Sequence, residues 1–176
     1  MANSFSIIVP CNAGEVLGLS NSVMYYLQQY TPALKELTIL RCKHVLVELF
    51  TNAIKHAGCT TVHFTVNVNA DAIVIQKVDT GLRLQLKQFN IHWDESVIGI
   101  KQHLYNALYL EVISAHELHF HILPPLSPEA IAIGTFAMHE HFGLQIIASA
   151  CSSFHYCYNT TTRENIYTAT IPLNDV

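Results

Sequence analysis

A row of side chains that could do chemistry lies between residues 48 and 56. Glu48, Asn52 and His56 are spaced by four residues, and Lys55 follows Asn52 by three. On an α-helix four residues advance about 400° around the axis, so these side chains share one face. That face offers a carboxylate, an amide, an ammonium group and an imidazole, which can exchange protons or bind ions. The row is either a solvated helix face or the polar wall of a site.

The string around this row, VELFTNAIKHAG at residues 47–58, resembles the N box of GHKL ATPases. It is most similar to anti-sigma-factor serine kinases and two-component histidine kinases. The resemblance implies that Asn52 coordinates Mg²⁺ through its side-chain oxygen, a hard ligand that suits this ion. It implies that Glu48 is the catalytic residue, which orients or deprotonates the attacking group. Lys55 and His56 match positions near the phosphates, where Lys55 could neutralise charge and His56 could equally be a packing residue.

A second motif of the family, D-x-G-x-G at the end of a strand, is partly present. The sequence has Asp79-Thr80-Gly81-Leu82-Arg83 directly after a predicted strand. By resemblance, Asp79 accepts a hydrogen bond from the adenine amino group, and Gly81 lets the backbone approach the base. Arg83 stands where the family has its second glycine.

The last motif of the family is a glycine-rich run before a helix, whose backbone amides hold phosphates. Here only Gly143 remains of that run, followed by Leu144, and the resemblance assigns both to the nucleotide site. His139 and His141 stand where the family needs bare backbone, and their rings crowd a phosphate. About 60 residues separate the second motif from the last, which implies an enlarged ATP lid at 82–138.

The histidines offer a separate kind of site. Of the 11 in the chain, His116, His119 and His121 lie in HELHFH, and His139 and His141 lie in HEH. A His-x-His pair on a strand places both rings on one face, where they can bind Zn²⁺ or Ni²⁺. The plain alternative is that they are polar residues of the surface or the lid.

The elements that would position these residues follow from apolar periodicity and from helix and turn signals. The predicted strands are 5–9, 61–69, 72–78, 154–158 and 165–173, and the predicted helices are 13–30, 31–57, 94–116 and 144–150. The helix at 31–57 starts at Thr31-Pro32 and stops at Gly58. Its predicted buried stripe is Leu40, Val45, Leu46, Leu49, Phe50, Ala53 and Ile54.

This order of elements predicts an α+β protein, a two-layer α/β sandwich with helices on one face of a mixed sheet. The resemblance makes it the Bergerat, or histidine-kinase-like, ATPase fold with an enlarged ATP-lid insertion. The length of 176 residues predicts one domain over 1–176.

Composition limits the compartment and the partners. The net charge is −4, and the nine Lys and Arg residues form no basic run, so we expect no nucleic-acid partner. Only 12% of residues are charged, so much of the surface should be uncharged. We expect no membrane association, because no secretory signal or apolar run of roughly 20 residues is present. Five cysteines without CxxC spacing favour free thiols in a reducing cytoplasm.

Three hypotheses of function stay open. One is an ATP-binding regulatory domain, similar to an anti-sigma-factor serine/threonine kinase, that uses ATP and Mg²⁺. The resemblance implies a sigma factor or an anti-anti-sigma protein as its partner, and a homodimer. The alternative is a degenerate, non-catalytic relative that acts as a protein-interaction module without productive ATP binding. Arg83, His139 and His141 favour this alternative. A metal-sensing module built on the histidines is a third hypothesis.

Overall fold

The computed structural model describes residues 3–31, 33–84, 101–105, 108–122 and 142–174. The predictions for His139, His141 and most of the 82–138 insertion lie outside these residues. The described elements, in chain order, are β1 (Asn3–Pro10), η1 (Ala13–Glu15), α1 (Val16–Tyr30), α2 (Glu36–Asn52), η2 (Ala53–Ala57), β2 (Thr61–Val68), β3 (Ala72–Asp79), β4 (Lys101–Tyr105), β5 (Leu108–Ser114), β6 (Glu117–Ile122), α4 (Phe142–Ala150), β7 (Ser153–Asn159) and β8 (Glu164–Pro172).

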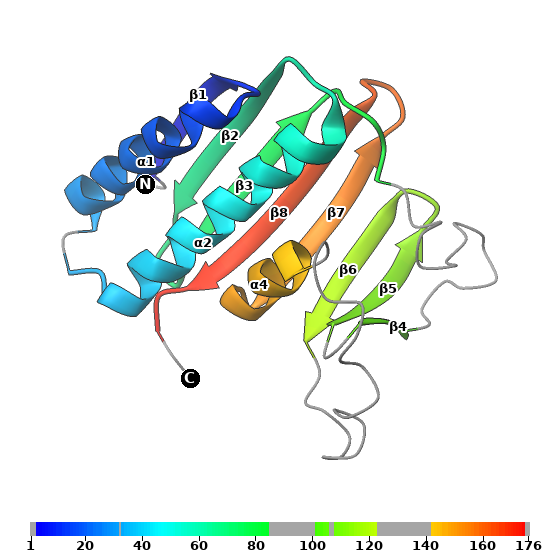
Figure 1. The fold of residues 1–176 in the computed structure, drawn as a ribbon. Helices are drawn as coiled ribbons and strands as arrows, with labels where there is room; N and C mark the ends of the chain where they lie inside the picture. The colour runs from blue at the N-terminus through cyan, green and yellow to red at the C-terminus, as the bar shows by residue number, and fades with distance from the viewer. Residues whose placement is uncertain (1–2, 32, 85–100, 106–107, 123–141, 175–176) are drawn as a thin grey trace.

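The strands of the described residues form one sheet in the order β1-β2-β3-β8-β7-β6-β5-β4. The helices α1, α2 and α4 lie on the same face of this sheet (Figure 1). The α+β class is confirmed, and the described helices lie on one face of the sheet as predicted. Every neighbouring pair of strands is antiparallel, so the prediction of a mixed sheet is wrong. Two helices separate β1 from β2, and the chain re-enters the sheet in the opposite direction, whereas a single crossover helix joins parallel strands.

The helix that carries the polar row differs from its prediction at both ends. Thr31 ends α1, where its backbone N–H donates to the Leu27 carbonyl at 2.8 Å, so α2 begins only at Glu36. The last turn before the stop is the π-helix η2. Gly58 then ends the helix as predicted, with a left-handed φ of 63° that glycine adopts without a Cβ clash.

The insertion is where the sequence pattern misleads. A helix is predicted at 94–116, but the described part of this stretch forms β4 and β5. Leu108, Leu110 and Val112 are fully buried, while the residues between them are half-buried. This alternation has the period of a strand, and leucine-rich runs of this length fit either element until packing decides. The prediction for 94–100 lies outside the described residues.

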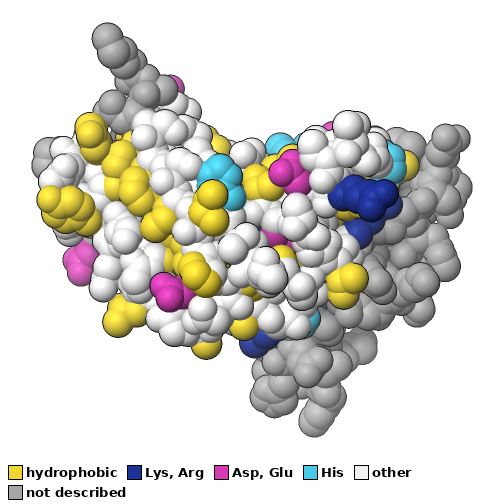
Figure 2. Space-filling view, turned by 90° about the horizontal axis from the view of Figure 1, so that it is seen from above, with side chains coloured by type: hydrophobic (Ala, Val, Ile, Leu, Met, Phe, Trp, Pro, Cys, Tyr) yellow, Lys and Arg dark blue, Asp and Glu magenta, His cyan; other side chains and the backbone are white. Residues whose placement is uncertain are grey.

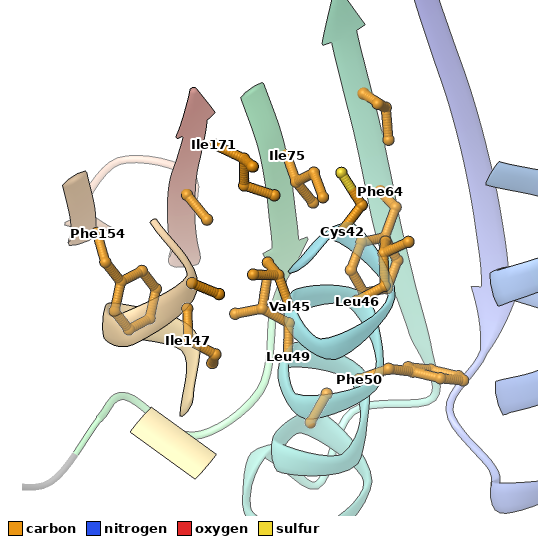
Figure 3. Close-up of a cluster of buried hydrophobic side chains, with 14 of the residues drawn as sticks. Cys42, Val45, Leu46, Leu49, Phe50, Phe64, Ile75, Ile147, Phe154 and Ile171 are labelled. Atoms are coloured by element: carbon orange, nitrogen blue, oxygen red, sulfur yellow. The ribbon is translucent and has the colours of Figure 1, made fainter. Parts of the chain in front are cut away.

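The core lies between the sheet and α2 (Figure 3). Four side chains of the predicted stripe, Val45, Leu46, Leu49 and Phe50, are at most 1% exposed. Figure 3 shows them facing side chains of the sheet and of α4, including Phe64, Ile75, Ile147, Phe154 and Ile171. Burial of each such side chain contributes about 1.5–3 kcal/mol. Leu40 departs from the prediction because it is 47% exposed, on the first turns of α2.

The surface has the low charge that composition predicts. In the face shown in Figure 2, blue and magenta side chains are isolated among white and yellow ones. Exposed large apolar side chains include Ile8, Leu17 and Tyr25, each at least 65% exposed. Among the helices of the described ranges, none is long and apolar enough to cross a membrane.

Candidate functional site

The end of α2 and the start of α4 bring three of the predicted residues together. Glu48 and Asn52 lie on α2, both half-buried, and Gly143 lies in the first turn of α4. A Cβ placed on Gly143 would lie 2.7 Å from Glu48 Oε2 and 3.2 Å from Asn52 Oδ1. The backbone of α4 therefore approaches these two side chains as closely as a glycine permits.

The polar atoms of Glu48 and Asn52 have no hydrogen-bond partner among the residues that the structure describes. Half-buried polar groups are normally satisfied by protein, water or a ligand. α4 starts beside them, and the first turn of an α-helix carries backbone N–H groups that have no partner within the helix. This corner therefore combines oxygen ligands for a cation with backbone donors for an anion.

Lys55 and His56 both lie in the π-helical turn η2 and are exposed. A π-turn has i→i+5 hydrogen bonds, so the spacing of side chains around the helix axis changes after Asn52. Both residues lie near the end of the helix that carries Glu48 and Asn52.

The second motif forms a buried corner at the end of β3. Asp79 is 3% exposed, and its Oδ1 accepts hydrogen bonds from the Gly81 N–H at 2.9 Å and from Asn165 Nδ2 at 2.9 Å. Its Oδ2 lies 2.6 Å from the Lys77 ammonium group. Both oxygens of the predicted adenine acceptor are therefore already in contact with donors of the protein itself.

Lys77 is an unusual residue for this position, because it is 2% exposed in the middle of the sheet. Its ammonium group lies 4.2 Å from the centre of the Tyr167 ring. Burial lowers the pKa of Lys77, and the Asp79 carboxylate opposes that shift. The ion pair, supported by the ring face, is what keeps a charge tolerable at this depth.

Asn165 is a site residue that the sequence patterns do not identify. Its Nδ2 reaches the carbonyl oxygens of Gly81 at 3.1 Å and Leu82 at 3.3 Å as well as Asp79. Its Oδ1 accepts a hydrogen bond at 2.7 Å from Tyr156, whose pKa burial raises to about 12. One asparagine at the start of β8 thus holds the whole turn after β3 in place.

Gly81 couples this corner to the end of the helix that carries Glu48 and Asn52. A Cβ on Gly81 would lie 2.7 Å from the carbonyl carbon of Ala57. The next residue, Leu82, donates its backbone N–H to the Ala57 carbonyl at 2.6 Å. The glycine is therefore required for close approach of backbone to backbone, and the turn after β3 is fastened to η2.

Two further predicted residues have clear places. Leu144 is half-buried and packs against the core. Arg83 lies 5.1 Å from the Tyr158 ring and donates to the Ala115 carbonyl, between β5 and β6. The arginine thus joins the turn after β3 to the strands of the insertion.

No family model matches the chain, and no curated protein sequence matches it.

Proposed function

We propose that this chain is an ATP-binding regulatory domain with the histidine-kinase-like ATPase fold, similar to the anti-sigma-factor serine kinases. The observation that carries the proposal is the meeting of Glu48, Asn52 and Gly143. The three residues come from two motifs that are far apart in the sequence. They converge at the end of one helix and the beginning of another, which is the arrangement a phosphate–metal group needs.

The residues at this corner fit a Mg²⁺–phosphate group. Asn52 and Glu48 supply oxygen atoms without described protein partners, and oxygen is the ligand that Mg²⁺ prefers. In the proposal Asn52 holds the metal, which neutralises phosphate charge, and Glu48 orients or deprotonates the attacking hydroxyl or water. Lys55 is close enough in the chain to contribute a positive charge from the exposed turn η2.

The carboxylate of Asp79 is not free to recognise adenine in the way that the resemblance implies. Asp79 contacts Lys77, Asn165 and the Gly81 amide, and its side chain is 1% exposed, so an adenine N–H has little access to it. A carboxylate oxygen has more than one lone pair, so Asp79 Oδ1 could take a further donor only at this crowded edge. We infer that binding depends more on the Glu48–Asn52 corner than on Asp79.

The contacts that already surround Asp79 also favour one alternative. This is a non-catalytic protein-interaction module that keeps the fold without productive nucleotide binding. Under either proposal a protein partner is expected, a sigma factor or an anti-anti-sigma protein by resemblance, with a homodimer as the assembly. Binding of Mg-ATP distinguishes the two functions, because only the first requires it.

Titration calorimetry of the purified chain with Mg-ATP is the direct test. We expect a dissociation constant below about 1 mM, the level where binding free energy is roughly 4 kcal/mol. Asn52→Ala should weaken binding at least about tenfold, because a metal ligand is lost. Glu48→Gln should lower ATP turnover more than ATP binding, because it removes the base and keeps the shape.

Asn21→Ala is the matched control, since Asn21 is an exposed asparagine on α1. It should bind Mg-ATP as the unmodified chain does. Binding weaker than millimolar in the unmodified chain would reject the ATP-binding proposal in favour of the interaction module. Intact binding and turnover in Asn52→Ala would reject the role given to Asn52.

A further inference from the structure

The described helices all lie on one face of the sheet, and the opposite face has its own cluster of ionisable side chains. On β6, Leu118 and Phe120 are buried on the helical side, so Glu117, His119 and His121 point to the opposite face. The register of β6 with β7 places His119 directly opposite His155. Residues from two strands thus gather at one place on the open face.

Three of these side chains converge closely. The rings of His119 and His155 have centroids 3.9 Å apart, and His119 Nε2 lies 3.2 Å from Glu117 Oε1. One potential ligand atom from each of Glu117, His119 and His155 lies within 4.8 Å of the other two. We propose that Glu117, His119 and His155 form a binding site for a transition-metal ion, with Zn²⁺ as the best match.

The ligand set and its spacing suit Zn²⁺. Zinc binds imidazole nitrogen and carboxylate oxygen at about 2.0–2.2 Å in a tetrahedron, so its ligands are about 3.3 Å apart. The candidate ligand atoms lie within 4.8 Å of one another, and side-chain rotation can bring them to this spacing without movement of the strands. His119 and Glu117 have that freedom, because their side chains are 26% and 41% exposed. Three protein ligands leave the fourth position to water.

The surroundings favour neutral imidazole, the form that binds metal. Burial lowers the pKa of His155, and the neighbouring His119 and His121 lower it further, while Glu117 opposes them. Ionisable groups beside the cluster include Glu111, which lies 2.9 Å from His121 Nε2, Tyr109, which pairs with His121 in the register of β5 and β6, and Cys157, which pairs with Glu117 in the register of β6 and β7. Imidazole binds a metal ion in its neutral form, which has a nitrogen lone pair.

Simple ion pairing explains only part of the cluster. It accounts for His119 with Glu117 and for His121 with Glu111. It does not account for His155, whose ring lies against the His119 imidazole at a tilt and has no hydrogen bond to the described part of the chain. A metal ion gives all three residues of the proposed site a common partner.

The position of the site suggests what the metal does. β6 belongs to the insertion, and β7 belongs to the closing hairpin of β7 and β8. An ion held by His119 and His155 would cross-link the insertion to the rest of the sheet. The site is on the sheet face opposite α2 and does not depend on the proposed nucleotide site.

Zinc titration of the tag-free chain tests the proposal, because a histidine tag would itself bind the ion. Calorimetry should give one Zn²⁺ per chain, with a rise in melting temperature on zinc addition. His119→Gln and His155→Gln keep a polar side chain of similar size, and each should weaken binding at least about tenfold. Co²⁺ in place of Zn²⁺ should give the visible absorption of a tetrahedral ion.

His63→Gln is the control, because His63 lies on β2 in the same sheet and hydrogen-bonds Ser6 away from the cluster. It should bind zinc as the unmodified chain does, and melting without metal shows that each variant folds. Absence of zinc binding and of any melting shift would overturn the proposal. So would folded His119→Gln and His155→Gln variants that bind as tightly as the unmodified chain, or an equal loss in His63→Gln.

Discussion

The two corners at the end of α2 differ in how their carboxylates are used. At the Asp79 corner, which we call the first corner, Asp79 is 3% exposed and contacts Lys77, Asn165 and a backbone amide. At the corner of Glu48, Asn52 and Gly143, which we call the second corner, Glu48 is half-buried and has no hydrogen-bond partner within the described ranges. The same type of side chain is therefore part of the framework in one place and available in the other.

This difference suggests a division of work along one helix. The Asp79 corner fastens the turn after β3 to Ala57, the last residue of η2. The Glu48 corner then presents the Glu48 and Asn52 side chains from the helix that η2 continues. Catalytic and binding groups need such a rigid support, because small displacements are costly to function. Substitutions at the first corner should affect stability, and substitutions at the second should affect binding.

Asp79→Ala should have the largest effect on stability. It leaves the Lys77 ammonium buried without its counter-ion and removes an acceptor from Asn165. Breaking one partner of a buried ion pair costs about 3–5 kcal/mol, which urea denaturation would measure as a lower midpoint. A double variant, Lys77→Met with Asp79→Asn, should lose less than Asp79→Ala, because neither charge remains.

Asp71→Ala serves as the control, since Asp71 is exposed at the turn between β2 and β3. Its effect should stay within about 0.5 kcal/mol. A loss as small as this in Asp79→Ala would mean that the first corner is not part of the framework.

Gly81→Ala should have the next largest effect. The added methyl group would meet the Ala57 carbonyl group, and backbone cannot move aside as a side-chain end can. Overpacking of this kind costs about 1–3 kcal/mol, and thermal melting would report it. Hydrogen exchange at the Leu82 amide should also become faster, because its bond to Ala57 is disturbed. Unchanged melting and exchange would contradict the tight approach of the two segments.

Much of the fold could be predicted from local patterns, because those patterns are strong outside the insertion. The alternation at 61–69 and the stop at Gly58 both lead directly to observed elements. The insertion could not be predicted in the same way. Whether Leu108–Val112 is a helix or a strand depends on its pairing with β6, which local sequence does not contain.

The residues of the candidate site also fall into those that local sequence identifies and those that it does not. Glu48, Asn52 and Gly143 could be selected because each stands in a recognisable motif, and the structure brings them together. Lys77 and Asn165 could not, because their roles are long-range. The Asn165–Asp79 contact joins residues 86 positions apart, and a lysine within an alternating strand gives no sign that it is buried. His155 could not be selected either, because its neighbour His119 is on another strand.

Gly143→Ala should have the smallest effect on stability, yet it tests the second corner most sharply. The new methyl group would contact Glu48 Oε2 and Asn52 Oδ1, which are ends of flexible side chains and can rotate away. Alanine is also the better helix former by about 1 kcal/mol. The free energy of unfolding should therefore change by less than about 1 kcal/mol.

Binding should respond to Gly143→Ala even though stability does not. Displacement of the Glu48 and Asn52 oxygens should weaken Mg-ATP binding about tenfold, by analogy with the loss of supporting contacts around a metal. Gly18→Ala is the control, because a Cβ on Gly18 would meet only Glu15 Oε2, at 3.8 Å. If Gly143→Ala binds Mg-ATP as well as Gly18→Ala does, then the contact between α2 and α4 is only packing. If Gly143→Ala instead unfolds like Gly81→Ala, the second corner belongs to the framework as well, and the contrast between the two corners fails.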